Sequence, residues 1–491
     1  MEAEQHEADS QASYPFTGRR SFLNWLRFDQ YRKLLLFDEV HKYYVVTDIA
    51  NFFDTVLHSH VAEALCGVPV PPRMIGLLFF LLEHLSIRQD YSSSHGISLP
   101  TDEFDCSRTL AHMVLYPHDA AMVELVGEDR YVRWMDDQNM AVSSKAEGLR
   151  VLAEVGRSLA RLHLTPNGQK SKILSLEEAR GHFHLDLNQA LDQAEDLTKR
   201  VATSNTATKR LASKVRGIWR RAKRNERIGE FGKILKRIYR LAGLAGLDIL
   251  RDRAADDIRS DPSLVKRVAG YYRCTGLTSE YLNFVEALMH HPEQVYPDVN
   301  VALVESLLRL EPAASEVPRI LKLALQILRR KNSFPGAEDC AAIAPLLLLR
   351  FGTRKQLPTL RRCFENRDRR TARQVVRAAA IVYASYGLKT FREVRRAAGT
   401  MLRNHLSTLV RLVDEIRSYS SVPDRYKARL TLGSDSVAGR KFVDMRVVLM
   451  ARLLLLSEKQ PVRGWVIQWR KSMVAAEISD YDRRLLRRLV K

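Results

Sequence analysis

Cysteine is scarce in this sequence, and its few copies are scattered. The five cysteines are Cys66, Cys106, Cys274, Cys340 and Cys363, and no two of them form a CxxC pair. This spacing argues against a structural zinc site and against a disulfide-stapled secreted domain. Since such a chain suits a reducing interior, we expect a cytoplasmic protein.

Long apolar segments are also missing. The apolar run at 340–349 is far shorter than the roughly 20 residues that a membrane-spanning helix needs. The N-terminal stretch MEAEQHEADSQASYP is polar and acidic and has no apolar signal core. We therefore expect a soluble protein with no membrane partner.

Acidic residues are too few to balance the basic ones. The 491 residues include 78 Lys and Arg but only 57 Asp and Glu, a formal charge of +21. This excess favours a polyanionic partner such as nucleic acid, with a generally basic soluble protein as the alternative. The chain is 46% hydrophobic and long enough for two or more folded domains.

The first 180 residues mix strand and helix patterns. The stretch YYVVTDI (43–49) is apolar and β-branched and predicts a buried strand, while RYVRWMDDQNMAV (130–142) predicts two strands joined by a turn. Residues 72–85 are apolar on most sides and predict a buried helix. Residues 107–116 predict a helix that stops at Pro117. We expect an α+β domain over residues 1–180.

From about residue 197 onward the pattern is helical and, at first, strongly basic. Residues 199–240 contain fifteen Lys or Arg but only two acids, Glu226 and Glu230. Clustered cations favour phosphate contacts through counterion release, although a solvated helix face is the alternative. The residues proposed for these contacts are Lys214, Arg216, Arg220, Arg221, Lys223 and Arg224.

Short amphipathic helices recur between residues 317 and 400 at intervals of roughly 20 residues. Pro335, Gly352, Pro358 and Gly387 punctuate them. In pairs, they give a period of about 40 residues, which is typical of HEAT or armadillo repeats. An irregular helical bundle is the alternative. We expect a basic helical connector over 181–240 and an all-α HEAT-like repeat domain over 241–491.

Three carboxylates lie where strands end. Asp48 follows the predicted buried strand, and Asp136 and Asp137 lie at the turn of the predicted strand pair. Unpaired acids at a buried strand end are costly, and a metal ion would remove that cost. Nucleotidyl transfer by two Mg²⁺ ions requires such hard oxygen ligands on rigid strands. We expect Mg²⁺ here, with Mn²⁺ as its substitute.

The flanks of these aspartates resemble two motifs of reverse transcriptases. VTDIANFFDTV (46–56) resembles motif A, an aspartate followed by a pair of aromatic residues. WMDD (134–137) resembles motif C, with Trp134 in place of the usual tyrosine.

Two further segments continue the resemblance in the order of that family. Residues 96–122 are similar to motif B through the core SRTLA, and LHLTPNGQKSKI (162–173) resembles motif D. The helical second half resembles the extension of abortive-infection and other defence-associated reverse transcriptases. This likeness implies a right-hand-type polymerase palm with short fingers, followed by the helical-repeat domain.

The resemblance also implies roles for individual residues. Phe53 matches the steric gate that selects deoxynucleotides, and Ile49 would offer its carbonyl to a metal ion. Lys170 would act on the leaving pyrophosphate. Ser107 and Arg108 would shape the nucleotide pocket. A core phenylalanine, a surface lysine and a helix cap are the respective alternatives for Phe53, Lys170 and Ser107.

The implied function is RNA-directed or template-independent DNA synthesis in antiphage defence. The expected partners are dNTPs, a DNA product and an RNA, either template or non-coding, and a homo-oligomer is left open. The alternative is a non-catalytic RNA-binding repeat scaffold that carries a degenerate palm.

Overall fold

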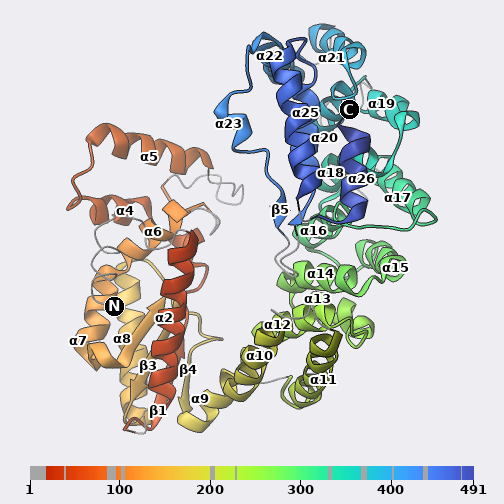
Figure 1. The fold of residues 1–491 in the computed structure, drawn as a ribbon. Coiled ribbons are helices and arrows are strands. Elements are labelled where there is room, and N and C mark those ends of the chain that lie inside the picture. Colours follow the sequence, from red (N-terminus) through yellow and green to blue (C-terminus); the bar gives the residue numbers. More distant parts are fainter. Residues whose placement is uncertain are drawn as a thin grey trace. The chain divides into compact units, whose positions relative to one another are not determined.

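The protein is mostly helical, with one small four-stranded antiparallel sheet near its N-terminus. The computed structural model describes residues 18–37, 40–85, 96–100, 105–198, 205–226, 229–329, 334–365, 373–400, 403–434, 441–476 and 478–490. The chain divides into two compact units, Met1–Leu185 and Asp186–Lys491 (Figure 1). None of the described helices has both the length and the apolar character to cross a lipid bilayer.

The sheet of the first unit is built around its earliest strand. Its strands are β1 (Tyr43–Thr47), β2 (Tyr131–Trp134), β3 (Asp137–Val142) and β4 (Lys172–Ser175). In the order β2-β3-β1-β4, strand β1 lies inside the sheet and pairs antiparallel with both β3 and β4. The predicted strand and the predicted strand pair are confirmed, although β1 ends at Thr47, two residues early.

Helices cover both faces of this sheet. The helices of the first unit are α2 (Gly18–Phe37), α3 (Phe52–Thr55), α4 (His58–Leu65), α5 (Pro72–Leu85), α6 (Asp105–Val114), α7 (Tyr116–Val126), α8 (Lys145–Arg161) and α9 (Leu176–His182). Val45 points into a core shared with α7 and α8, whereas its neighbour Tyr44 points into a second core shared with α2 and α9. Because both faces are covered, β1 can be apolar on both sides.

Helix α5 forms where it was predicted but is not buried. Met74, Leu77 and Phe80 are 57%, 52% and 56% exposed in this unit, while Leu82 lies in the core. The prediction of a buried helix is therefore wrong. An apolar run without a polar stripe indicates a helix but does not indicate what covers it.

The helix predicted over 107–116 is two helices in the structure. Helix α6 begins at Asp105 and ends at Val114, and α7 begins at Tyr116 with Pro117 in its first turn. Proline lacks the N–H that the first turn leaves unbonded, so Pro117 starts a helix here and does not merely stop one. Ser107 lies inside α6 and is not its cap.

The second unit is a succession of helices around one continuous core. These are α10 (Leu185–Thr198), α11 (Asn205–Ala222), α12 (Phe231–Leu244), α13 (Ala254–Ser260), α14 (Val265–Thr275), α15 (Thr278–Met289), α16 (Pro297–Leu307), α17 (Val317–Arg329), α18 (Ala337–Phe351), α19 (Leu357–Glu365), α20 (Arg373–Ala384), α21 (Leu388–Thr400), α22 (Arg403–Ser418), α23 (Asp424–Lys427), α24 (Met445–Leu454), α25 (Gln460–Ala475) and α26 (Asp480–Leu489). Strands β5 (Gly433–Ser434) and β6 (Lys441–Phe442) pair antiparallel among them, which corrects the all-α expectation for this region.

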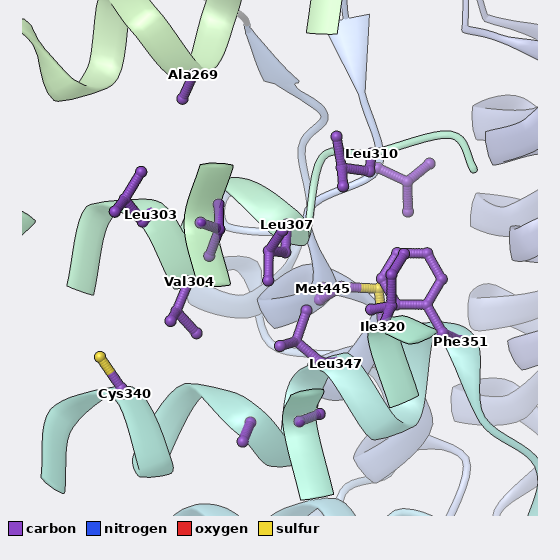
Figure 2. Packing of buried hydrophobic residues seen from close by; sticks show 14 of the residues in the cluster. Ala269, Leu303, Val304, Leu307, Leu310, Ile320, Cys340, Leu347, Phe351 and Met445 are labelled. Carbon is purple, nitrogen blue, oxygen red and sulfur yellow. The ribbon is translucent and has the colours of Figure 1, made fainter. Parts of the chain in front are cut away.

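Alternate helices of the second unit stack on one another. Contacts join α12 to α14, α14 to α16, α16 to α18, α18 to α20 and α20 to α22. Figure 2 shows this packing at the level of side chains, where Leu307 of α16 lies near Leu347 of α18. A row of alternate helices is the arrangement expected when each helix pair buries its apolar face against the next pair.

Candidate active site

The register between β1 and β3 determines where the three candidate carboxylates lie. The last pair of the ladder is Thr47 with Gln138. One further step of this antiparallel register brings Asp48 opposite Asp137, and Asp136 precedes Asp137 in the turn. Directly opposite residues have Cα atoms about 4.5–5.5 Å apart. Strand pairing therefore gathers acids that are 88 residues or more apart in the sequence (136 − 48 = 88).

The Asp48 carboxylate is buried and only partly satisfied. Its Oδ2 accepts a hydrogen bond of 3.1 Å from the Asn167 side chain, and Lys170 Nζ lies 2.9 Å from the same oxygen. Its Oδ1 is buried and has no hydrogen-bond partner. Burial removes water from this oxygen and no hydrogen bond replaces it, so a bound cation would offset the cost of desolvation.

Asp136 has a strongly raised pKa. Burial is the largest cause, followed by repulsion from Asp137 and from Asp48, and together they raise the pKa to about 7. When Asp136 is protonated it would also donate a hydrogen bond to Asp48. Two or more carboxylates that share one site cannot all ionise at ordinary cost. The neighbouring carboxylates therefore make ionisation of Asp136 costly.

Lys170 is the cation closest to this cluster. Partial burial alone would lower its pKa, but the hydrogen bond to Asp48 and the attraction of Asp48, Asp137 and Asp136 outweigh burial and raise the pKa. Its side chain remains 61% exposed.

The donor set fits Mg²⁺ in its chemistry, since it consists of hard carboxylate oxygens. The partnerless Oδ1 of Asp48 and the raised pKa of Asp136 both indicate a missing positive charge. Within the part of the chain that the structure describes, however, no three His, Cys, Asp or Glu side chains are already spaced around a metal position. Ion binding would therefore require these carboxylates to move closer together.

A buried ion pair holds the turn that carries Asp136 and Asp137. The Arg133 side chain is 3% exposed, and its Nε donates to Asp119 Oδ1 at 2.6 Å while its Nη1 donates to the Met135 carbonyl at 2.8 Å. Tyr131 also donates to Asp119, at 2.8 Å. Met135 has a φ of 55°, a left-handed conformation that a non-glycine residue adopts at a cost.

Sequence reasoning missed Arg133 and Asp119. The only signal was a charged residue inside the otherwise uncharged strand segment YVRW. A buried arginine requires an acid, but its position in the next helix back could not be read from a single sequence.

The motif D segment returns to the end of β1. The Asn167 amide donates to the Asp48 carbonyl at 2.7 Å, and the Ala50 amide donates to the Thr165 carbonyl at 2.9 Å. These bonds form an isolated bridge between Ile49 and Pro166. The bridge does not use the Ile49 carbonyl, which was predicted as a metal ligand.

The two aromatics after Asp48 are placed differently. Phe52 is buried in the core between the sheet and α8, whereas Phe53 is only partly buried at its edge. Their ring centroids are 5.5 Å apart. Ser107 is buried and Arg108 is half-buried on α6. Phe53 is therefore partly accessible, and its role as a steric gate stays a prediction.

The predicted nucleic-acid contacts lie largely on helix α11. Its buried stripe, which includes Leu211, Val215 and Ile218, packs into the core and leaves the basic side chains outward. The exposed ones are Arg216, Arg220, Arg221, Lys223 and Arg224, and Lys214 is half-exposed and donates to Gln193 at 2.7 Å. Lys223 Nζ also lies 5.2 Å from the centre of the Trp219 ring.

No protein-family model matches this chain, and no curated protein sequence matches it either. The function of the chain is therefore inferred from its structure and its sequence motifs.

The raised pKa of Asp136 predicts that the stability of the protein in metal-free buffer depends on pH. Since its pKa is raised in the folded protein, the native state loses stability as the pH rises from about 4 to about 7. Asp136→Asn should therefore stabilise the first unit by about 1–3 kcal/mol at about pH 8, with a gain that fades toward pH 4. Slower hydrogen exchange of the β1 and β3 amides in EDTA measures this gain.

The matched control is Asp129→Asn, which changes an exposed acid of the same unit and should leave this exchange unchanged. A destabilised Asp136→Asn, or a gain that does not depend on pH, would show that Asp136 does not carry the repulsion.

Proposed function

We propose that the protein is a DNA-synthesising polymerase of the reverse-transcriptase type, either RNA-directed or template-independent. The observation that carries this proposal is the cluster of Asp48, Asp136 and Asp137 at the ends of paired strands, in which the buried Oδ1 of Asp48 has no hydrogen-bond partner and the pKa of Asp136 is raised. On this proposal the four-stranded sheet with α6, α7 and α8 is the palm. The order of the four sequence motifs supports it.

The residues that would hold Mg²⁺ or Mn²⁺ are Asp48, Asp136, Asp137 and the Ile49 carbonyl. Bound ions would supply the acidity that activates a 3′-hydroxyl and the positive charge that stabilises the leaving pyrophosphate. In this transfer the 3′-oxygen bonds to the α-phosphorus of a dNTP, the bond to pyrophosphate breaks, and the hydroxyl proton is released. Lys170 lies at the edge of the cluster and can neutralise or protonate the departing pyrophosphate.

The second unit supplies features that suit a long polyanion. The outward cations of α11 form a face for phosphates. The row of alternate helices from α12 to α22 supports a HEAT-like solenoid, a fold that commonly presents an extended binding surface. RNA, as template or as a non-coding partner, is the proposed ligand, and antiphage defence is the role that the family resemblance implies.

A non-catalytic RNA-binding scaffold is the second candidate. It is favoured by one observation, namely that the described carboxylates are not already spaced around a metal position. The buried, partnerless Oδ1 of Asp48 favours catalysis, because a degenerate palm would gain stability by losing this acid.

The test is nucleotide incorporation by the purified full-length chain with labelled dNTPs and Mg²⁺. Asp137→Asn and Asp136→Asn should each reduce incorporation by roughly two to three orders of magnitude, because they weaken the charge that stabilises the transition state. Digestion of the product by DNase, RNase and protease identifies it. Asp129→Asn should retain full activity. Full incorporation by folded Asp136→Asn and Asp137→Asn would contradict the proposal.

The steric-gate assignment makes a separate prediction. Phe53→Val should raise the incorporation of ribonucleotides relative to deoxynucleotides by about tenfold or more, because the smaller side chain leaves room for the 2′-hydroxyl. The control is Phe52→Leu, a change at the buried neighbour, which should lower stability without changing sugar selectivity. An unchanged ratio in Phe53→Val would place the gate elsewhere.

The basic face of α11 makes a prediction about salt. Reversing Arg216, Arg220 and Arg221 to Glu should weaken RNA binding and reduce the slope of log affinity against log salt. The slope should fall by about 0.7 for each lost phosphate contact on a single strand. Fluorescence anisotropy at several salt concentrations measures both quantities, with circular dichroism as the check on folding. A fixed slope in a folded variant would show that this face is only solvated.

A further inference from the structure

The second unit contains a pocket whose lining is strongly cationic. It has a volume of about 560 Å³ and lies beside the C-terminal end of α18 and the ends of α20, α24 and α26. Four arginines line it, Arg354, Arg452, Arg463 and Arg488, and no aspartate or glutamate is among its lining residues. A pocket of this size is typical of small-molecule sites.

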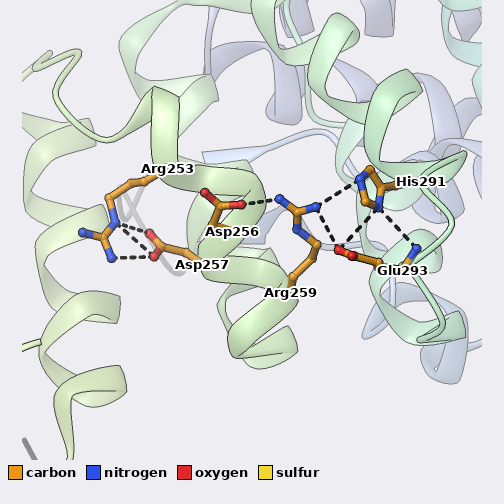
Figure 3. Close-up of polar contacts among 6 residues, drawn as sticks. All are labelled: Arg253, Asp256, Asp257, Arg259, His291 and Glu293. Carbon is orange, nitrogen blue, oxygen red and sulfur yellow. Dashed lines mark hydrogen bonds and ion pairs between the residues drawn. The ribbon is translucent and has the colours of Figure 1, made fainter. Parts of the chain in front are cut away.

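None of these four arginines forms an ion pair with a carboxylate in the described parts of the chain. Some other arginines of the same unit are paired with acids. Arg253 binds Asp257, and Arg259 binds both Asp256 and Glu293 (Figure 3).

Arg452 is held in place without an acid. Its Nε donates to the Ser385 carbonyl at 3.2 Å and its Nη1 donates to the Leu489 carbonyl at 2.9 Å. The guanidinium carbon lies 4.5 Å from the centre of the Tyr386 ring. Arg488 is likewise bound to a backbone oxygen, the carbonyl of Arg350. These contacts position both guanidinium groups but leave their charges uncompensated.

The arginines of this pocket repel one another. The pKa of Arg452 is lowered, first by burial and then by the nearby charges of Arg354 and Arg488, with Tyr386 acting in the opposite direction. An anion bound among these cations would reduce their repulsion, which favours binding.

The walls of the pocket are set by the backbone. A Cβ atom at Gly352 would collide with the Leu348 carbonyl oxygen, so only glycine fits there. Gly387 has a φ of 137°, which also favours glycine. Behind the pocket, Arg350 and Asp482 form a buried ion pair of 3.0 Å between α18 and α26. Of the lining arginines, Arg354, Arg463 and Arg488 are exposed and Arg452 is half-buried, so the pocket opens to solvent beside the ends of these helices.

We propose that this pocket binds the phosphate chain of a nucleoside triphosphate. Arginine forks match phosphate oxygens with two parallel hydrogen bonds, and several of them together suit a chain of phosphates better than a single one. The rest of the nucleotide would lie against the apolar surface of Tyr386, Leu455, Leu456 and Leu489. This site is separate from the carboxylate cluster, which belongs to the first unit, and the inference does not depend on the proposed polymerase activity.

The test is isothermal titration of the full-length chain in EDTA with ATP, tripolyphosphate and AMP. ATP and tripolyphosphate should bind, and AMP should bind at least about tenfold more weakly, since most of the affinity comes from the phosphate chain. Arg354→Glu should raise the Kd for ATP by about tenfold or more. Lys355→Glu makes the same charge change at the next residue, which does not line the pocket, and should alter the Kd by less than about twofold.

Two further variants separate a true effect from a loss of folding or of the other site. If Arg354→Glu does not fold, Arg463→Glu takes its place, with exposed Arg487→Glu as its control. Asp137→Asn should leave ATP binding in EDTA unchanged. Equal losses in Arg354→Glu and Lys355→Glu, or absence of ATP binding, would each overturn the proposal.

Discussion

The pairing of β1 with β3 is the constraint on which the first unit depends. Its register places Asp48 beside Asp137, and like charges directly opposite each other on neighbouring strands are destabilising. The fold retains this arrangement because the apolar residues of β1 are buried on both faces of the sheet. A shift of one residue would turn Tyr44 and Val45 to the wrong faces, so their burial fixes the register.

Much of the local structure exists to support this pairing. Asn167 and Lys170 return to Asp48 from the segment before β4, and Arg133 fixes the turn before β3 through Asp119 and the Met135 carbonyl. Each of these contacts gives a hydrogen bond or an ion pair to a buried charged group or backbone carbonyl. Two costs remain: the buried Oδ1 of Asp48 has no hydrogen-bond partner, and the pKa of Asp136 is raised because its ionised form is destabilised.

The sequence was informative where a local rule had one solution. Strand β1 followed from β-branched residues, and Gly352 and Gly387 marked helix boundaries, because these patterns depend on neighbours in the chain. The sequence was uninformative where the answer depends on distant partners. Arg133 pairs with an acid 14 positions earlier, and the arginines of the pocket come from distant parts of the sequence. The exposure of α5 depends on what packs against this helix, which no local pattern describes. The carboxylate site lies between these cases, since the motifs placed the acids at strand ends and only the register brought them together.

Charge that a folded chain leaves uncompensated is a physical indication of what it binds. The first unit concentrates acids beside one lysine, and the second unit concentrates arginines without an acid. The repulsion among the acids is relieved when Asp136 is protonated or when a cation binds, and the repulsion among the arginines is relieved when an anion binds. Because a ligand that binds only the folded state stabilises it by mass action, stability and binding are linked at both places. The charge of +21 is therefore not spread evenly along the chain. Acidic residues gather around Lys170 in the first unit, and arginines gather around the pocket in the second unit.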